Sequence, residues 1–284
     1  MNDKSNKVTY YLKDDFECPI CDTKFQKEEI LSGGGRMNAG KLTDELHRNY
    51  KATVKFGEIF PLIYPVATCP NCYYSAFSKD FFFKKGDHNS LVFDIEKRKN
   101  AFKRIFPDLD FESNRTLKEG IASYFYAMMC YDYLGKETCP TLKQSLCAIR
   151  GAWLCKDLHR KFPGENYDYL AAVFYRKASF FYNRVIEKES TGEENITMVP
   201  HLGPDIDKNY GYDGILYLAG LLEVKYGQRQ DPERRIAALK KSRSIVARIV
   251  GMGRSSKSKP SVILDLSRDL HKNIKEELEA LGGA

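Results

Sequence analysis

The sequence predicts a mainly α-helical protein, built from antiparallel helical hairpins, with a small β subdomain at its N-terminus. Three observations support this fold class. Two Cys-Pro-x-Cys steps occur within the first 72 residues, and glycine, proline and turn residues are frequent up to about residue 85. Long segments with helical spacing of apolar residues follow. We therefore expect two units, residues 1–85 and residues 86–284.

The N-terminal unit is predicted to contain short extended segments. Residues 8–12 (VTYYL) and 60–68 (FPLIYPVAT) have the composition of strands, and each leads toward one cysteine pair. The glycine cluster at 33–35 excludes a regular element. Residues 42–50 (LTDELHRNY) are expected to form a short helix.

The remainder is predicted to be helical. Thr116 is an expected N-cap, Gly135 an expected helix end and Pro140 a first-turn proline, while Asp231-Pro232-Glu233 opens a later helix. Short connections between helices of this length imply antiparallel hairpins. The expected helices span 88–106, 116–135, 141–162, 166–189, 210–226, 232–250 and 261–281.

Two helical pairs have the character of degenerate tetratricopeptide units, so the fold is predicted to be a tetratricopeptide-like array. They are 151–158 with 170–185, and 214–227 with 234–242. No strict 34-residue period occurs, and a plain helical bundle is the alternative. The intervening loop, 190–209, is long enough to suggest a functional or disordered excursion.

The four N-terminal cysteines are the strongest indication of a site. Cys18, Cys21, Cys69 and Cys72 form two CP-x-C steps, each of which places two thiolates on one tight turn. Four soft ligands suit tetrahedral Zn²⁺, so we expect one structural zinc ion in a zinc-ribbon-like subdomain with an expanded central loop. An iron–sulfur cluster and unbound structural cysteines are the alternatives. A closed shell of four thiolates argues against metal catalysis.

No catalytic residue or organic cofactor is predicted. The five histidines are scattered without an HExxH motif, and no GxxxxGK[ST] loop occurs. The other cysteines are expected to be small buried side chains. Neither a secretory signal nor a transmembrane segment is evident, so we expect a cytoplasmic protein. These other cysteines are Cys130, Cys139, Cys147 and Cys155.

Positive charge is concentrated near the C-terminus. The chain carries a net charge of +7, and residues 228–260 alone hold ten basic residues against Asp231 and Glu233. Arg234, Lys241 and Arg248 recur at intervals of seven on one helix. They predict a stripe that contacts nucleic acid or an acidic partner. A solvated basic face is the alternative, since no aromatic residue is interleaved to stack on bases.

These motifs resemble those of a bacterial family of uncharacterised proteins, catalogued as a domain of unknown function. The resemblance rests on ECPICDTKF (17–25), YPVATCPNCYYSAF (64–77), GAWLCKDL (151–158) and YLAGLLEVKYG (217–227). It covers most of residues 8–250, and the SGGGRMNAGKLTDELHRNY insertion is similar to spirochaete-type members. The resemblance implies an N-terminal zinc-ribbon-like segment followed by tetratricopeptide-like helices. It implies no activity.

We expect a non-enzymatic scaffold or adaptor that binds a protein partner on the concave surface of the helices. Nucleic-acid binding through the ribbon and residues 229–259 is the first alternative, and an enzyme with an unrecognised pocket is the second. The expected groove residues are Tyr167, Tyr175, Arg176, Tyr217 and Lys225.

The segment after the second cysteine pair is predicted to join the two units. Tyr74 or Phe77 should be buried between them. Tyr73 occupies a position that usually needs a left-handed residue, which would strain a tyrosine. Either this turn avoids the left-handed conformation, or packing against Phe77 or the aromatic helices holds Tyr73 in it.

Overall fold

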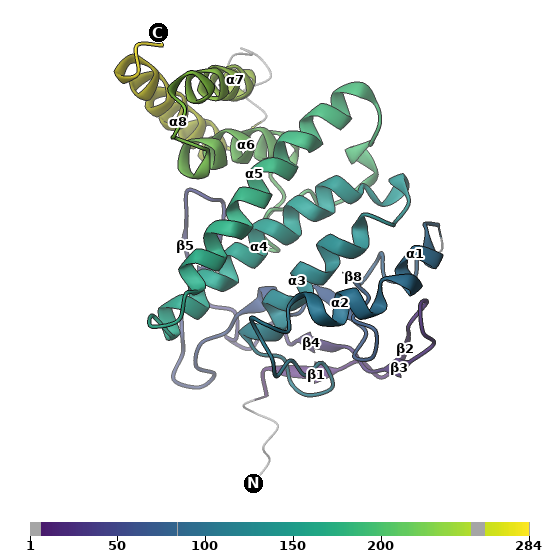
Figure 1. The fold of residues 1–284 in the computed structure, drawn as a ribbon. Helices are drawn as coiled ribbons and strands as arrows, with labels where there is room; N and C mark the ends of the chain where they lie inside the picture. Colours follow the sequence, from purple (N-terminus) through teal and green to yellow (C-terminus); the bar gives the residue numbers. More distant parts are fainter. Residues whose placement is uncertain (1–6, 84, 251–258, 284) are drawn as a thin grey trace.

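The computed structural model describes residues 7–83, 85–250 and 259–283. Short strands form a layer below three long helices, α3, α4 and α5, which lie side by side, and α6, α7 and α8 pack at the far end (Figure 1). The mainly helical, antiparallel fold class is confirmed. The helices are α1 (His88–Phe93), α2 (Ile95–Ala101), α3 (Leu117–Tyr131), α4 (Pro140–Lys161), α5 (Tyr167–Thr191), α6 (Gly211–Tyr226), α7 (Pro232–Val250) and α8 (Ser261–Ala280).

The strands of the described residues form antiparallel pairs near the N-terminus. Each pair is short, and in the first, third and fourth the two strands have three or four residues each. A single 3₁₀ turn, η2 (Pro61–Ile63), precedes the last pair. The pairs are β1 (Thr9–Tyr11) with β4 (Glu28–Ile30), β2 (Phe16–Glu17) with β3 (Lys24–Phe25), β5 (Ala39–Leu42) with β6 (Arg48–Tyr50), and β7 (Val66–Thr68) with β8 (Ser75–Phe77).

The expected helix starts are confirmed. Thr116 forms a capping box with Glu119, in which each side chain satisfies a backbone amide of the first turn of α3. Pro140 is the first residue of α4. The Asp231 carboxylate accepts a hydrogen bond from the Arg234 amide at 3.1 Å and so caps α7.

The helix expected at 42–50 is wrong. Leu42 ends β5, Arg48 begins β6, and residues 43–47 form the turn between them. Leu46 adopts a positive φ of 58° and is fully buried. Tertiary contacts therefore override the helical periodicity of this segment, because its apolar and acidic side chains are bound by α4, α5 and α6.

Two expected helices are shorter than predicted. The helix at 88–106 breaks at Asp94, whose carboxylate accepts a hydrogen bond from the Tyr133 hydroxyl at 2.6 Å. After α2, Phe102 and Phe106 turn into the core. The next helix, α3, ends at Tyr131, and Gly135 instead precedes a 3₁₀ turn (η3, Lys136–Thr138).

The predicted burial of Tyr74 or Phe77 between the N-terminal strands and the helices is confirmed. Tyr74 has no exposed surface, and the Phe77 amide donates to the Tyr131 hydroxyl on α3 at 3.1 Å. The Ser75 amide lies 3.4 Å from the Cys130 sulfur, also on α3. Strand β8 is thus bound to α3, and one continuous apolar core runs from the strands through the helices.

Three of the expected groove residues are not free for a partner. Tyr175 and Tyr217 are buried, and the Tyr217 hydroxyl donates to the Asp44 carbonyl at 2.7 Å. Lys225 pairs with Asp44 at 2.7 Å. The turn of the β5–β6 hairpin therefore fills this part of the array (Figure 1).

Helix α5 extends to Thr191, and the rest of the loop expected at 190–209 contacts α4 through Glu194 and Pro204. The buried carboxylate of Glu194 accepts hydrogen bonds from the Thr141 hydroxyl at 2.6 Å and from Lys188 at 2.8 Å. Asp205 is also completely buried. The loop thus places two acidic side chains inside the fold.

Candidate metal centre

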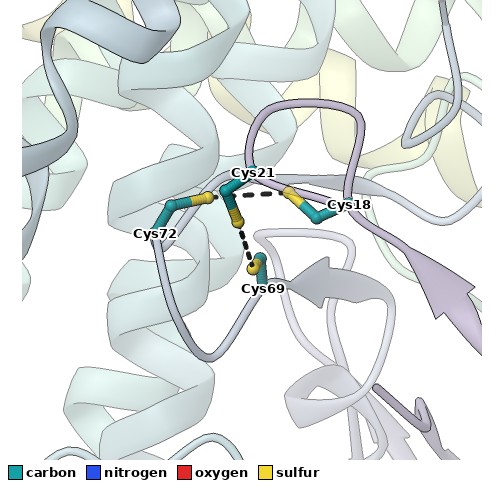
Figure 2. Close-up of side chains that lie close together, drawn as sticks. All are labelled: Cys18, Cys21, Cys69 and Cys72. Carbon is teal, nitrogen blue, oxygen red and sulfur yellow. Dashed lines mark hydrogen bonds between the residues drawn. The ribbon is translucent and has the colours of Figure 1, made fainter. Parts of the chain in front are cut away.

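The four cysteines of the two CP-x-C steps meet at one point. Their sulfur atoms all lie within 4.8 Å of one another. The sulfur of Cys18 is 3.6 Å from that of Cys72, and the sulfur of Cys21 is 3.6 Å from that of Cys69 (Figure 2). Three of the four side chains are buried and Cys21 is half-buried. The two cysteine pairs, which 47 residues separate in the sequence, therefore lie together as expected.

Each cysteine pair lies on a turn between two paired strands. The first turn connects β2 to β3, and the second connects β7 to β8. In the first, the Asp22 amide donates to the Cys18 carbonyl at 2.9 Å; in the second, the Tyr73 amide donates to the Cys69 carbonyl at 3.0 Å. The two turns thus share one backbone arrangement and present their sulfurs to a common centre.

The residue that follows the second cysteine has a left-handed backbone conformation in both turns. Asp22 has a φ of 56° and Tyr73 a φ of 57°. The idea that the second turn avoids this conformation is therefore wrong. Packing against the aromatic helices holds Tyr73 there, as the alternative proposed: the distance between ring centroids is 5.1 Å to Tyr126 of α3 and 5.4 Å to Phe111.

Neighbouring side chains hold the second turn against the helices. The buried guanidinium of Arg98, on α2, donates to the Cys72 carbonyl at 3.3 Å and to the Leu91 carbonyl at 2.6 Å. Near the first turn, the Asn71 amide contacts the Cys21 sulfur at 3.7 Å. Such contacts orient the ligands of a metal and limit solvent access.

The donor set fits a soft metal ion. Hydrogen bonding with Cys18 and Cys69 raises the pKa of the Cys72 thiol far above its ordinary value. Hydrogen bonds from Cys18 and Cys72 lower the pKa of Cys69 to about 2. Four sulfurs this close cannot all be thiolates unless a cation compensates their charge. Four buried thiolates would complete the shell of a tetrahedral ion, so the centre can bind a metal but leaves no position for a substrate.

The other four cysteines are buried and separate from this centre, as expected. Burial raises the pKa of Cys147 and of Cys155, both on α4. Protonated, buried thiols of this kind are chemically inert packing residues.

The predicted basic stripe lies on the exposed face of α7. Arg234, Lys241 and Arg248 are all exposed. Arg234 pairs with Asp231 at 3.2 Å and Lys241 with Glu187 at 3.2 Å. Of the remaining basic residues in the tract, Arg254 and Lys257 lie outside the described residues, while Arg235 is buried inside the fold, only 2% exposed.

A further polar cluster gave no signal in the sequence. His47, in the β5–β6 turn, contacts the carboxylate of Asp205, which lies 158 positions later in the chain. The His47 ring stacks on Trp153 of α4, with 4.2 Å between ring centroids. None of these residues belongs to a catalytic motif, and only the fold brings them together.

The fold and site together define a class of mainly helical proteins whose N-terminal hairpins carry a four-cysteine centre. No helix in the described part of the chain has the length and apolar character needed to span a membrane. The chain belongs to the family described as "Uncharacterized protein conserved in bacteria (DUF2225)", whose model matches residues 11–274. The predicted resemblance is confirmed.

A relative in the spirochaete Borreliella burgdorferi, described as "Uncharacterized protein", is similar over nearly its whole length. The two sequences are 42% identical over 276 residues, which covers 97% of this chain and 99% of the relative. No solved structure matches the chain.

Proposed function

We propose that the protein is a zinc-stabilised helical scaffold that binds a protein partner, and that the metal has a structural role. The closed set of four sulfurs supports the structural role, because bound metal would join the β2–β3 hairpin to the β7–β8 hairpin, which packs on α2 and α3. Zinc is the proposed ion, since it prefers tetrahedral thiolate ligands. A cytoplasmic location, where thiols stay reduced, is part of the proposal.

An apolar groove between the α2–α3 connection and α5 is the proposed contact surface. It is the main observation that supports the scaffold proposal. It encloses about 520 Å³ and is lined by Ile105, Phe125, Tyr169 and Val173, among others. Tyr169 is 68% exposed and Ile105 is 42% exposed. Large apolar side chains that stay exposed together are typical of a surface for an apolar partner segment.

The chemistry of this groove favours a peptide or helix as the bound segment. Its floor is aromatic, with Phe102 stacked on Phe125 at 4.5 Å between ring centroids. Arg104, Glu165 and Lys177 lie at its margin. An apolar centre with a charged margin matches an amphipathic helix that buries one face and leaves the other in water. Tyr167, an expected groove residue, also lines this groove.

Co-purification of the full-length protein from its native cells tests this surface. Tyr169→Asp and Ile105→Asp place charges in the groove and should remove a partner that the unchanged protein retains. Phe93→Asp is the matched control, because Phe93 is 88% exposed on α1 and does not line the groove. Equal recovery of the partner by all three variants would overturn the proposed surface.

Nucleic-acid binding by the α7 stripe has less support. Two of its three cations already pair with carboxylates, which reduces the charge available to phosphates. Reversing Arg234, Lys241 and Arg248 to glutamate should leave binding to a short DNA duplex at low salt unchanged. A steep, salt-dependent loss would instead favour the nucleic-acid function.

A further inference from the structure

A cleft of about 500 Å³ lies between the β5–β6 hairpin, residues 58–62 and α4. Its size is that of a small-molecule site. Four carboxylates and four lysine or arginine side chains line it, so its formal charges cancel. The metal-binding cysteines are not among its lining residues. This cleft is independent of both the metal centre and the proposed partner groove.

A buried carboxylate orients an imidazole in this cleft. Asp205 is completely buried, and its Oδ2 lies 2.6 Å from Nδ1 of His47. The same carboxylate accepts the backbone amides of Arg48 at 2.8 Å and Ile206 at 2.6 Å. Burial would raise the pKa of Asp205, but the hydrogen bonds from His47 and from these two amides outweigh burial and lower it. An ionised Asp205 needs a donor, so Nδ1 of His47 carries the proton.

The other ring nitrogen of His47 is available in the cleft. No group of the described residues hydrogen-bonds to Nε2, and this atom is not among the buried unpartnered ones. When Nδ1 carries the proton of a neutral imidazole, Nε2 holds a free lone pair. The ring is nearly parallel to that of Trp153, with 12° between their planes, which fixes its direction.

An acid lines the same cleft. The Asp157 carboxylate contacts Arg160 at 3.4 Å, and its side chain is 23% exposed. Burial raises the pKa of Asp157, although the charge of Arg160 opposes that effect. The Asp157 carboxyl group is thus a half-buried polar group that can hydrogen-bond to a small molecule in this cleft.

We propose that this cleft hydrolyses a small uncharged ester or amide, with His47 as the general base. Nε2 of His47 removes a proton from water as the water oxygen bonds to the carbonyl carbon. The bond from that carbon to the leaving group breaks, and the leaving oxygen or nitrogen takes the proton from Nε2 of His47. His47 thus passes the proton of water to the leaving group and returns to its starting form, so no oxidant or reductant is needed. Asp205 is a positioning residue, since it acts through His47.

Hydrolysis of p-nitrophenyl acetate by the metal-loaded, full-length protein tests the proposal. This neutral ester fits the charge balance of the cleft and releases a coloured product. His47→Gln should lower the protein-dependent rate at least about tenfold, since a general base contributes roughly 10²–10⁴ with a matched substrate. His271→Gln, on α8, is the matched control and should leave the rate unchanged. Equal rates in both variants would overturn the proposal.

Chemical modification of the protein without substitutions tests the same role of His47. This test does not depend on whether a variant folds. Diethyl pyrocarbonate transfers an ethoxycarbonyl group to an accessible imidazole nitrogen, and mass spectrometry locates it. Modification of His47 should proceed in step with loss of ester hydrolysis. Full hydrolysis after complete modification of His47, or modification of other histidines while His47 stays unreactive, would overturn the proposal.

The role of Asp205 has a spectroscopic test. In the unchanged protein, ¹⁵N chemical shifts should show the proton of His47 on Nδ1. Asp205→Asn should shift part of that proton to Nε2 and lower ester hydrolysis to the level of His47→Gln. A tautomer that is unchanged by Asp205→Asn would show that Asp205 does not position His47.

Discussion

Glu45, at the turn of the β5–β6 hairpin, accepts a hydrogen bond from the Tyr175 hydroxyl of α5 at 2.6 Å. The same carboxylate oxygen accepts the Trp153 indole N–H of α4 at 2.7 Å, and Lys225 of α6 lies 3.1 Å from the other oxygen. Glu45 is only 4% exposed. One buried carboxylate thus links the N-terminal hairpin to three successive helices.

Removing this carboxylate should be costly. Glu45→Ala leaves the Trp153 N–H and the Tyr175 hydroxyl buried without an acceptor, which should lower the free energy of unfolding by about 3 kcal/mol. Asp44→Ala is the matched control, because Asp44 is half-exposed and its ion pair with Lys225 should contribute less than about 1 kcal/mol. Urea unfolding measures both. Similar losses in the two variants would contradict the role of Glu45.

The contribution of Glu45 should depend on pH. Burial alone would raise its pKa, but the hydrogen bond from Tyr175 and the charges of Lys156 and Lys225 outweigh burial and lower it below 4.5. A lowered folded-state pKa gives stability that is fully present above pH 4.5 and is lost as the pH falls through the folded-state value. Glu45→Gln should therefore be less stable than the unchanged protein at pH 7, and the difference should shrink below pH 4.5. A constant difference between pH 7 and pH 3.5 would contradict this.

Metal binding should depend on the four cysteines of the centre alone. Metal analysis of the purified protein should find about one zinc per chain, and Cys69→Ser should abolish it, because three thiolates and a poor hydroxyl ligand no longer match the ion. Cys147→Ala is the control, since Cys147 is equally buried but lies within α4. It should lose some stability and keep its zinc. Iron, or a metal content unaffected by Cys69→Ser, would refute the proposed ion or its site.

The two left-handed ligand turns should respond oppositely to glycine. Asp22→Gly relieves the positive φ without loss of packing, so it should stabilise the protein by up to about 1 kcal/mol. Tyr73→Gly relieves the same strain but removes a ring packed on Phe111 and Tyr126, and should cost about 2 kcal/mol. Thermal unfolding of the zinc-loaded variants measures both. Stabilisation by Tyr73→Gly would show that packing does not hold this turn.

The features predicted correctly from the sequence depend on local chemistry. Capping residues such as Thr116 and the first-turn Pro140 act within one turn of their own helix, so the pattern around them is sufficient. The two cysteine pairs lie far apart, but each is a recognisable ligand turn by itself. That the two pairs lie together was inferred from metal chemistry, because four thiolates complete a tetrahedral zinc site.

The features that were missed depend on contacts between distant segments. The β5–β6 turn has helical periodicity, and its actual conformation follows from partners of Glu45 that lie 108 to 181 positions away. His47 and Asp205 share no motif for the same reason. In the basic tract, Arg234 and Arg235 are adjacent arginines in the same sequence context, yet Arg235 is buried and Arg234 is exposed. Which arginine faces inward is decided by the packing of α6, α7 and α8.

Arg235 should therefore contribute much more stability than its neighbour. Its guanidinium donates to the Glu277 carboxylate of α8 at 2.8 Å, and to the carbonyls of Glu223 at 2.7 Å and Val224 at 3.0 Å in the last turn of α6. A lysine cannot reproduce this fork of donors, so Arg235→Lys should cost about 2–4 kcal/mol.

Arg234→Lys is the matched control, because Arg234 is exposed and should change stability by less than about 0.5 kcal/mol. Hydrogen exchange distinguishes a local effect from a global one. Since Arg235 joins α8 to α6, Arg235→Lys should speed amide exchange in residues 261–280 more than in α3 and α4, which lie outside this contact. Uniform acceleration along the chain, or equal stability of the two variants, would show that Arg235 does not hold the C-terminal helix in place.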